Sequence, residues 1–172
     1  MNKEMEKHSI HVFEPSGPPE EDVLERNLQA LRTVGFEVDY TPLQTDARGR
    51  LERDGVRTRL EEVQSALKSA HRYLLSARGG YGVSELMSQL DWQTLAQNPA
   101  KVLIGFSDVS ALQSAMFARL GWPSLHAPMP GSPLWQGGAD VVELTDLLSS
   151  DRPWRGEFEV TPVREMTVIE CQ

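Results

Sequence analysis

Short apolar runs alternate with amphipathic stretches along most of this chain. The clearest run is Val102, Leu103 and Ile104, whose unbroken apolar character is typical of a strand covered on both faces in a parallel sheet. From Asp108 onward the apolar positions recur at helical spacing, and Gly121 suits the end of that helix. Further strands are predicted at residues 9–13, 36–40, 73–77 and 124–127, and further helices at residues 23–34, 57–70, 83–90 and 139–148.

The alternation of strands with helices predicts a layered α/β domain with a largely parallel sheet flanked by helices. We expect this domain to occupy residues 1–150. Residues 41–55 are polar and carry turn residues such as Asp46 and Gly49, so a mobile crossover is predicted there. Residues 157–172 alternate like a strand but have little to pack against within this chain.

The composition is acidic and contains almost no cysteine. The 172 residues include 17 Lys and Arg against 25 Asp and Glu, which gives a formal net charge of -8. Such a surface argues against nucleic acids and anionic membranes as main partners. Cys171 is the single cysteine, so an intrachain disulfide or a cysteine-rich metal site is excluded. The charged start, residues 1–8, cannot form a signal peptide or a membrane span, and we expect a cytoplasmic protein.

Ser107 lies between the end of the predicted strand at 102–104 and the first turn of the next helix. In an open α/β sheet this is the carboxyl edge, where ligands bind. A tight turn there projects the hydroxyl outward, and backbone N–H groups of the first helical turn can stabilise a developing oxyanion. Gly105 fits such a nucleophile elbow, but Val109 stands where a second glycine is usual. The alternative is that Ser107 or Asp108 simply caps the helix.

A glycine-rich loop, Arg78-Gly79-Gly80-Tyr81-Gly82, follows the predicted strand at 73–77. Its glycines permit a sharp turn with N–H groups pointing inward, a geometry that binds anions, although a plain tight turn would use glycine too. Within it, Arg78, Tyr81 and Gly82 are the candidate substrate-binding residues. This loop and the Ser107 turn both end strands, so they should share one edge, which is the candidate active site. His126 ends another predicted strand, and a lone histidine of this kind is more often structural than catalytic.

Taken together, these motifs resemble the serine LD-carboxypeptidases, a family that includes the microcin C self-immunity peptidases. The resemblance covers the chain to about residue 135 and follows the order of the family's motifs. The motifs are Pro15-Ser16-Gly17, Ala77-Arg78-Gly79-Gly80-Tyr81-Gly82, Leu90-Asp91-Trp92, Gly105-Phe106-Ser107-Asp108 and His126-Ala127-Pro128-Met129. The resemblance implies a flavodoxin-like N-terminal domain.

The resemblance also implies the chemistry. Ser107 would be the nucleophile of a Ser-Glu-His triad, and the backbone N–H of Asp108 with one from Gly79 or Gly80 would form the oxyanion hole. The implied substrate is a cytoplasmic muropeptide tetrapeptide, which loses its terminal D-alanine during peptidoglycan recycling. No metal or cofactor is needed, because a neutral histidine can take the proton of the serine. The full-length protein is expected to be a homodimer, as is usual in the family.

The chain departs from the family pattern because the glutamate and the histidine of that triad come from a second, C-terminal domain. No histidine follows His126, which belongs to the small loop motif. The later glutamates match no family motif: Glu143, Glu157, Glu159, Glu165 and Glu170. Residues 151–172 are therefore expected to be a linker or a truncated start of the second domain, and this chain alone is expected to be inactive. Glu14 and Ala127 are milder departures, at positions where a small residue and a glycine are usual.

The sequence leaves three functions open. The first is the LD-carboxypeptidase itself. The second is a microcin-immunity-type peptidase, which would use the same residues on a toxin resembling an acyl-aminoacyl-adenylate. The third is a non-catalytic module in which the loop of residues 78–82 holds a phosphate or a muropeptide.

Overall fold

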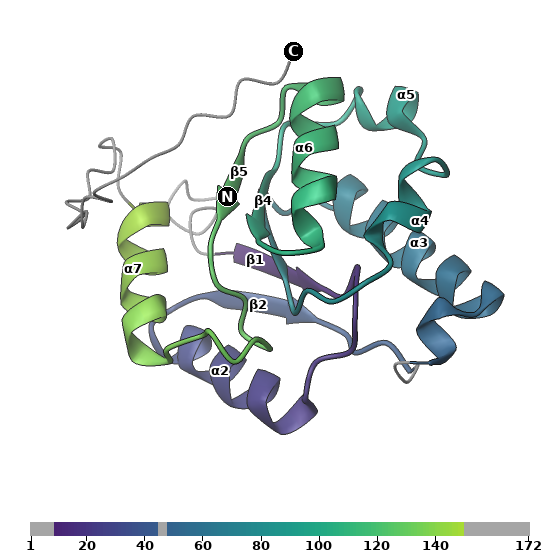
Figure 1. Cartoon of the computed structure of the whole chain (residues 1–172). Coiled ribbons are helices and arrows are strands. Elements are labelled where there is room, and N and C mark those ends of the chain that lie inside the picture. Colours follow the sequence, from purple (N-terminus) through teal and green to yellow (C-terminus); the bar gives the residue numbers. More distant parts are fainter. Residues whose placement is uncertain (1–8, 45–47, 150–172) are drawn as a thin grey trace, which may run out of the picture.

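A central parallel sheet organises the computed structural model, which describes residues 9–44 and 48–149 (Figure 1). The strands of the described part are β1 (Ser9–Phe13), β2 (Glu37–Tyr40), β3 (Tyr73–Ser76), β4 (Val102–Gly105) and β5 (Ser124–His126). They lie in the order β2-β1-β3-β4-β5, and every neighbouring pair is parallel. This order is the flavodoxin-like one, so the predicted layered α/β fold is confirmed.

Helices cover both faces of the sheet (Figure 1). One face carries α2 (Glu21–Thr33) and α7 (Gly138–Ser149). The other carries α3 (Arg53–Lys68), α4 (Val83–Met87), α5 (Trp92–Leu95) and α6 (Val109–Leu120), and the short 3-10 helix η1 (Gly49–Leu51) precedes α3. None of the described helices has the length and hydropathy needed to cross a bilayer.

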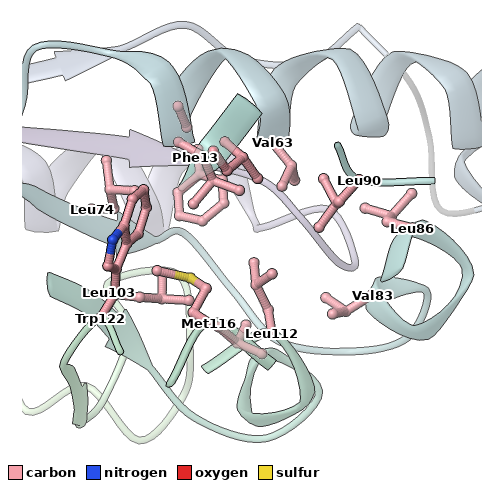
Figure 2. Close-up of a cluster of buried hydrophobic side chains, with 14 of the residues drawn as sticks. Phe13, Val63, Leu74, Val83, Leu86, Leu90, Leu103, Leu112, Met116 and Trp122 are labelled. Carbon is pink, nitrogen blue, oxygen red and sulfur yellow. The ribbon is translucent and has the colours of Figure 1, made fainter. Parts of the chain in front are cut away.

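Successive residues of each central strand enter opposite cores. Leu74 packs with Phe13 and Leu103 against α3, α4 and α6, and Figure 2 shows this cluster around Phe13. Leu75, its neighbour in β3, packs on the other face against α2 and α7. Both leucines are fully buried, and each such side chain contributes about 1.5–3 kcal/mol to folding. The continuous apolar runs seen in the sequence follow from this double coverage.

The segment before α3 contains secondary structure that was not predicted. Residues 41–55 include η1 and the first turn of α3, which begins at Arg53 instead of residue 57. Gly55 explains the close packing, because a Cβ there would lie 1.9 Å from the carbonyl oxygen of Gly49. Residues 45–47 lie outside the described residues, so the mobility predicted for residues 41–55 stays a prediction.

The segment between β3 and β4 contains two short helices where one longer helix, at residues 83–90, was predicted. α4 ends at Met87 and does not reach residue 90. Asp91 is the N-cap of α5, and its carboxylate accepts a hydrogen bond from the Thr94 backbone N–H at 3.1 Å. The predicted tail, residues 151–172, lies outside the described residues, so its assignment as a linker stays a prediction.

Candidate active site

Three loops meet at the carboxyl edge of the sheet, after β1, β3 and β4. The Gly17 N–H donates to the Gly79 carbonyl at 3.1 Å, which joins the first two loops. The Ser16 hydroxyl donates to the Asp108 carboxylate at 2.8 Å, which joins the first and the third. The glycine-rich loop and the Ser107 turn therefore share one edge, next to the point where the strand order reverses and open α/β sheets bind ligands.

Ser107 adopts a left-handed backbone conformation, with φ 64°, and it is the only non-glycine residue of the described part with a positive φ. This conformation costs about 1–2 kcal/mol in a residue that has a Cβ. Ser107 is exposed, and its carbonyl accepts from the Ser110 N–H in the first turn of α6. Such retained strain is typical of functional positions, and the turn has the geometry of a nucleophile elbow.

Gly79 lies directly against Ser107. A Cβ at Gly79 would be 3.2 Å from the Ser107 Oγ and 3.3 Å from the Met129 Cε, so a side chain would press on the hydroxyl. Gly80 follows with φ +130°, and a Cβ there would lie 3.0 Å from the Gly17 nitrogen. The loop after β3 therefore approaches the Ser107 turn and the loop after β1 too closely for a side chain at either glycine. This close approach places the backbone of the loop next to the serine.

Asp108 does not cap α6, although capping was one interpretation of the sequence. It stands at the N-cap position, but its carboxylate makes no capping hydrogen bond to that helix. It accepts instead from the Val83 N–H at 3.0 Å, at the start of α4, and from the Ser16 hydroxyl. Through these two hydrogen bonds, Asp108 connects the Ser107 turn to the loop after β1 and to the start of α4.

The candidate substrate-binding residues differ in their surroundings. The Tyr81 side chain is 81% exposed and is accessible to a ligand. Arg78 donates to the Pro18 carbonyl at 2.8 Å and so ties the loop after β3 to the loop after β1. Gly82 has φ +117°, and a Cβ there would lie 2.4 Å from the Arg59 guanidinium. Gly82 is therefore explained by packing on Arg59.

Arg59 is a buried arginine that holds the loops near the site together, and the sequence did not reveal this role. Its guanidinium donates to the Arg50 carbonyl, to the Pro15 carbonyl at 3.0 Å and to the Glu85 carboxylate at 2.8 Å. A signal was present, because Arg59 lies one turn before Val63 on the buried face of α3. A charge on an apolar helix face indicates a buried polar partner.

A second buried polar cluster lies beneath the loop after β1. The Glu14 carboxylate pairs with Arg50 and accepts hydrogen bonds from the Tyr40 hydroxyl at 2.7 Å and the Leu43 N–H at 3.0 Å. The Glu62 carboxylate accepts from the Glu14 N–H at 3.2 Å. Burial, and then the negative charge of Glu14, raise the pKa of Glu62 to about 8. The glutamate that departs from the family pattern is thus paired inside the fold.

His126 lies at the end of β5, where its ring contacts Phe106 edge-on at 5.9 Å between ring centroids. It also lines a cavity of about 550 Å³ between β5 and α7, together with Trp135, Glu143 and Leu144. Ser107 is not among the residues that line this cavity. Of the glutamates considered for the triad, Glu143 is the one within the described residues.

The sequence profile of the LD-carboxypeptidase N-terminal domain matches residues 10–127. This chain belongs to the LD-carboxypeptidase family. The resemblance inferred from the motifs is thereby confirmed. The chain is 34% identical over 163 residues to the murein tetrapeptide carboxypeptidase of Pseudomonas aeruginosa, covering 91% of this chain and 52% of that protein. It is 35% identical over 123 residues to a protein of Streptomyces coelicolor named as a carboxypeptidase, covering 70% and 40%.

Solved structures of the microcin C7 self immunity protein MccF and its relatives share the fold. MccF in complex with glutamyl sulfamoyl guanosine has a TM-score of 0.72 at 21% identity, covering 86% of this chain and 46% of that one. An MccF-like protein from Bacillus anthracis has a TM-score of 0.59 at 24% identity, covering 72% and 38%. The chain spans about half the length, or less, of the relatives it matches.

Proposed function

We propose that the full protein is a serine LD-carboxypeptidase that removes the terminal D-alanine from muropeptide tetrapeptides, with Ser107 as the nucleophile. The observation that carries this proposal is the strained turn at Ser107, with φ 64°, placed against Gly79 at the carboxyl edge of the sheet. The 34% identity to a murein tetrapeptide carboxypeptidase supports the choice of substrate. The proposed setting is the cytoplasm, where peptidoglycan fragments are recycled.

The proposed reaction uses main-chain donors around the serine. Attack by the Ser107 hydroxyl on the peptide carbonyl creates an oxyanion, and the N–H groups of Asp108 and of Gly79 or Gly80 are its proposed donors. The fastening of Asp108 to Ser16 and Val83 supports this role, because donors stabilise an oxyanion best when they are held in place beforehand. Arg78, Tyr81 and Gly82 are the proposed substrate-binding residues, and exposed Tyr81 is the one best placed to move onto a ligand.

The proposed general base is a histidine outside this chain, oriented by a glutamate. A serine hydroxyl is a weak nucleophile until a base takes its proton. The family pattern puts both residues in a C-terminal domain, and the relatives are about twice as long as the matched region. Residues 1–150 are then the nucleophile-bearing domain and residues 151–172 the connection to the second. We also propose that the full-length protein is a homodimer, as in the family it resembles.

The test is Ser107→Ala in the full-length protein, with Ser110→Ala in the first turn of α6 as the matched control. Release of D-alanine from a muropeptide tetrapeptide should fall about 1,000-fold or more in Ser107→Ala and stay near normal in Ser110→Ala. Near-normal turnover by Ser107→Ala would contradict the proposal. The 172-residue chain by itself should release no D-alanine, and turnover by it would return His126 to consideration as the base.

The same assay separates the alternatives. An immunity-type peptidase would cleave an aminoacyl sulfamoyl nucleoside and leave the muropeptide intact, again through Ser107. A binding module would bind muropeptide with unchanged affinity in Ser107→Ala and release no D-alanine in any form. The higher sequence identity to the murein enzyme than to MccF favours the carboxypeptidase.

A further inference from the structure

Three side chains that commonly ligate transition metals gather on the face of the sheet that carries α3 and α6. His11 comes from β1, Asp39 from β2 and His71 from the residues just before β3. His11 and Asp39 are direct partners in the β1–β2 register, so their side chains share a face. One potential ligand atom from each residue lies within 4.8 Å of the other two. The cluster lies toward the amino end of the sheet, away from the Ser107 turn.

The spacing of these atoms suits a small divalent ion. The Asp39 Oδ2 lies 2.8 Å from the His11 Nδ1 and 3.9 Å from the His71 Nε2. Tetrahedral zinc, with bonds of about 2.0–2.2 Å to nitrogen and oxygen, separates its ligand atoms by roughly 3.3–3.6 Å. The two distances lie on either side of this range, and the ligand atoms of the two histidines lie within 4.8 Å of each other.

The imidazole of His71 presents its Nε2 toward Asp39, 3.9 Å from the carboxylate oxygen, and its ring centroid lies 5.3 Å from that of His11. The other ring nitrogen of His71, Nδ1, is buried without a hydrogen-bond partner in the described structure. Burial, and then the neighbouring His11, lower the pKa of His71. The Asp39 side chain is 50% exposed, which leaves room for a water ligand.

The charged groups around the cluster shift the pKa of His71 in opposite directions. Asp39 and Glu37 raise the pKa of His71, whereas Lys101, whose ammonium donates to the His71 carbonyl at 2.9 Å, lowers it. The cluster offers one carboxylate and two imidazole nitrogens, a set of ligands that binds divalent transition metals.

We propose that His11, Asp39 and His71 bind one Zn²⁺ ion, with water as the fourth ligand. Two imidazoles and one carboxylate suit zinc better than calcium or magnesium, which prefer sets of oxygen ligands. The ion links the edge strand β2 to β1 and to the entrance of β3, so its effect is on the sheet. The site is independent of the proposed hydrolysis, for which no metal was expected.

The test uses the untagged full chain after treatment with a chelator. Isothermal titration with ZnCl₂ near neutral pH should show one ion bound per chain, and CoCl₂ should give the intense visible absorption of four-coordinate cobalt. Zinc at roughly 100 times its dissociation constant should raise the unfolding midpoint by about 5–10 °C. Absence of stoichiometric binding would overturn the proposal and leave a hydrogen-bonded His11–Asp39 pair as the whole role of the cluster.

Matched variants identify the ligands. His71→Gln and Asp39→Asn should abolish both the cobalt absorption and the thermal shift. His126→Gln, at the other edge of the sheet, and Glu37→Gln, which removes a negative charge from the same strand as Asp39, should retain both. Equal binding by all four variants would assign the metal to scattered surface carboxylates and overturn the proposal. Circular dichroism of each metal-free variant checks that the sheet is intact.

Discussion

The two ends of the sheet present their polar groups in different ways. At the carboxyl end the candidate active site is formed largely by main chain, with left-handed Ser107 packed against Gly79. Charged side chains such as Arg59 are buried behind these loops. At the amino end, the His11–Asp39–His71 cluster is formed by side chains, and none of its three residues has a positive φ.

This difference determines what each end tolerates. A main-chain site depends on the shape of its loops, so it is sensitive to added volume and to loss of the buried groups that hold the loops. A side-chain site depends on the identity of a few atoms, so it can lose its function while the fold is kept. Substitutions at the carboxyl end should therefore change stability and activity together.

The largest effect is expected from removal of Arg59, which is fully buried. Arg59→Met should lower the free energy of unfolding by about 3–5 kcal/mol, because it removes the hydrogen bonds that the buried guanidinium donates to backbone carbonyls of two loops. Glu85, its ion-pair partner, is 43% exposed, so Glu85→Gln should cost less than about 1 kcal/mol. Urea denaturation measures both. Equal losses in the two variants would show that the ion pair matters and the backbone contacts do not.

The next effect is expected at Gly80 and concerns activity. Gly80→Val in the full-length protein should reduce turnover about 100-fold or more if the proposed oxyanion donor is displaced, because loss of one such donor is typically worth about 3 kcal/mol. The substitution also places a side chain at φ +130° against the Gly17 backbone, so stability should fall as well.

Gly121 provides the matched control. It also has a positive φ, +66°, but a Cβ there meets no atom within 4 Å. Gly121→Val should lose stability from backbone strain and keep its turnover per folded molecule. If both variants lost turnover equally, the effect at Gly80 would come from reduced stability, and the loop would be only a structural turn.

Local patterns predicted the fold and the position of Ser107. The apolar run of β4 passes directly into the α6 periodicity, so the serine between them could be placed from adjacent residues alone. The contacts that hold the turn could not, because Ser16 and Asp108 are 92 residues apart in sequence. Asp108 at a helix start favoured a cap, and only the tertiary structure reveals that its carboxylate faces α4.

The histidine cluster was beyond sequence reasoning for a related reason. Its three residues come from separate elements, and the spacing of His11, Asp39 and His71 along the chain matches no metal-binding motif. Their meeting depends on the strand order β2-β1-β3 and on the register that pairs His11 with Asp39. Neither can be deduced from hydrophobic periodicity, which is the same for any order of buried strands.

The smallest effect is expected from Glu62, whose carboxylate lies beside Glu14 in the buried cluster under the candidate active site. Burial, and then Glu14, raise its pKa from 4.5 to about 8. The folded state therefore holds a proton on Glu62 that the unfolded chain releases above about pH 4.5. Between these two pKa values the contribution of this group to stability falls as the pH rises.

Glu62→Gln should remove this dependence, because the amide imitates the protonated carboxyl and its oxygen can still accept from the Glu14 N–H. One unit of pKa shift corresponds to about 1.4 kcal/mol, and the interaction is shared with Glu14, so we expect the variant to gain about 1–2 kcal/mol over wild type between about pH 5 and pH 8. Urea denaturation across this range measures the gain. Glu61→Gln, an exposed neighbour on α3, is the control and should follow the wild-type profile. Parallel profiles for wild type and Glu62→Gln would mean that Glu62 is ionised in the folded protein, with its charge balanced by Arg50 despite the intervening Glu14.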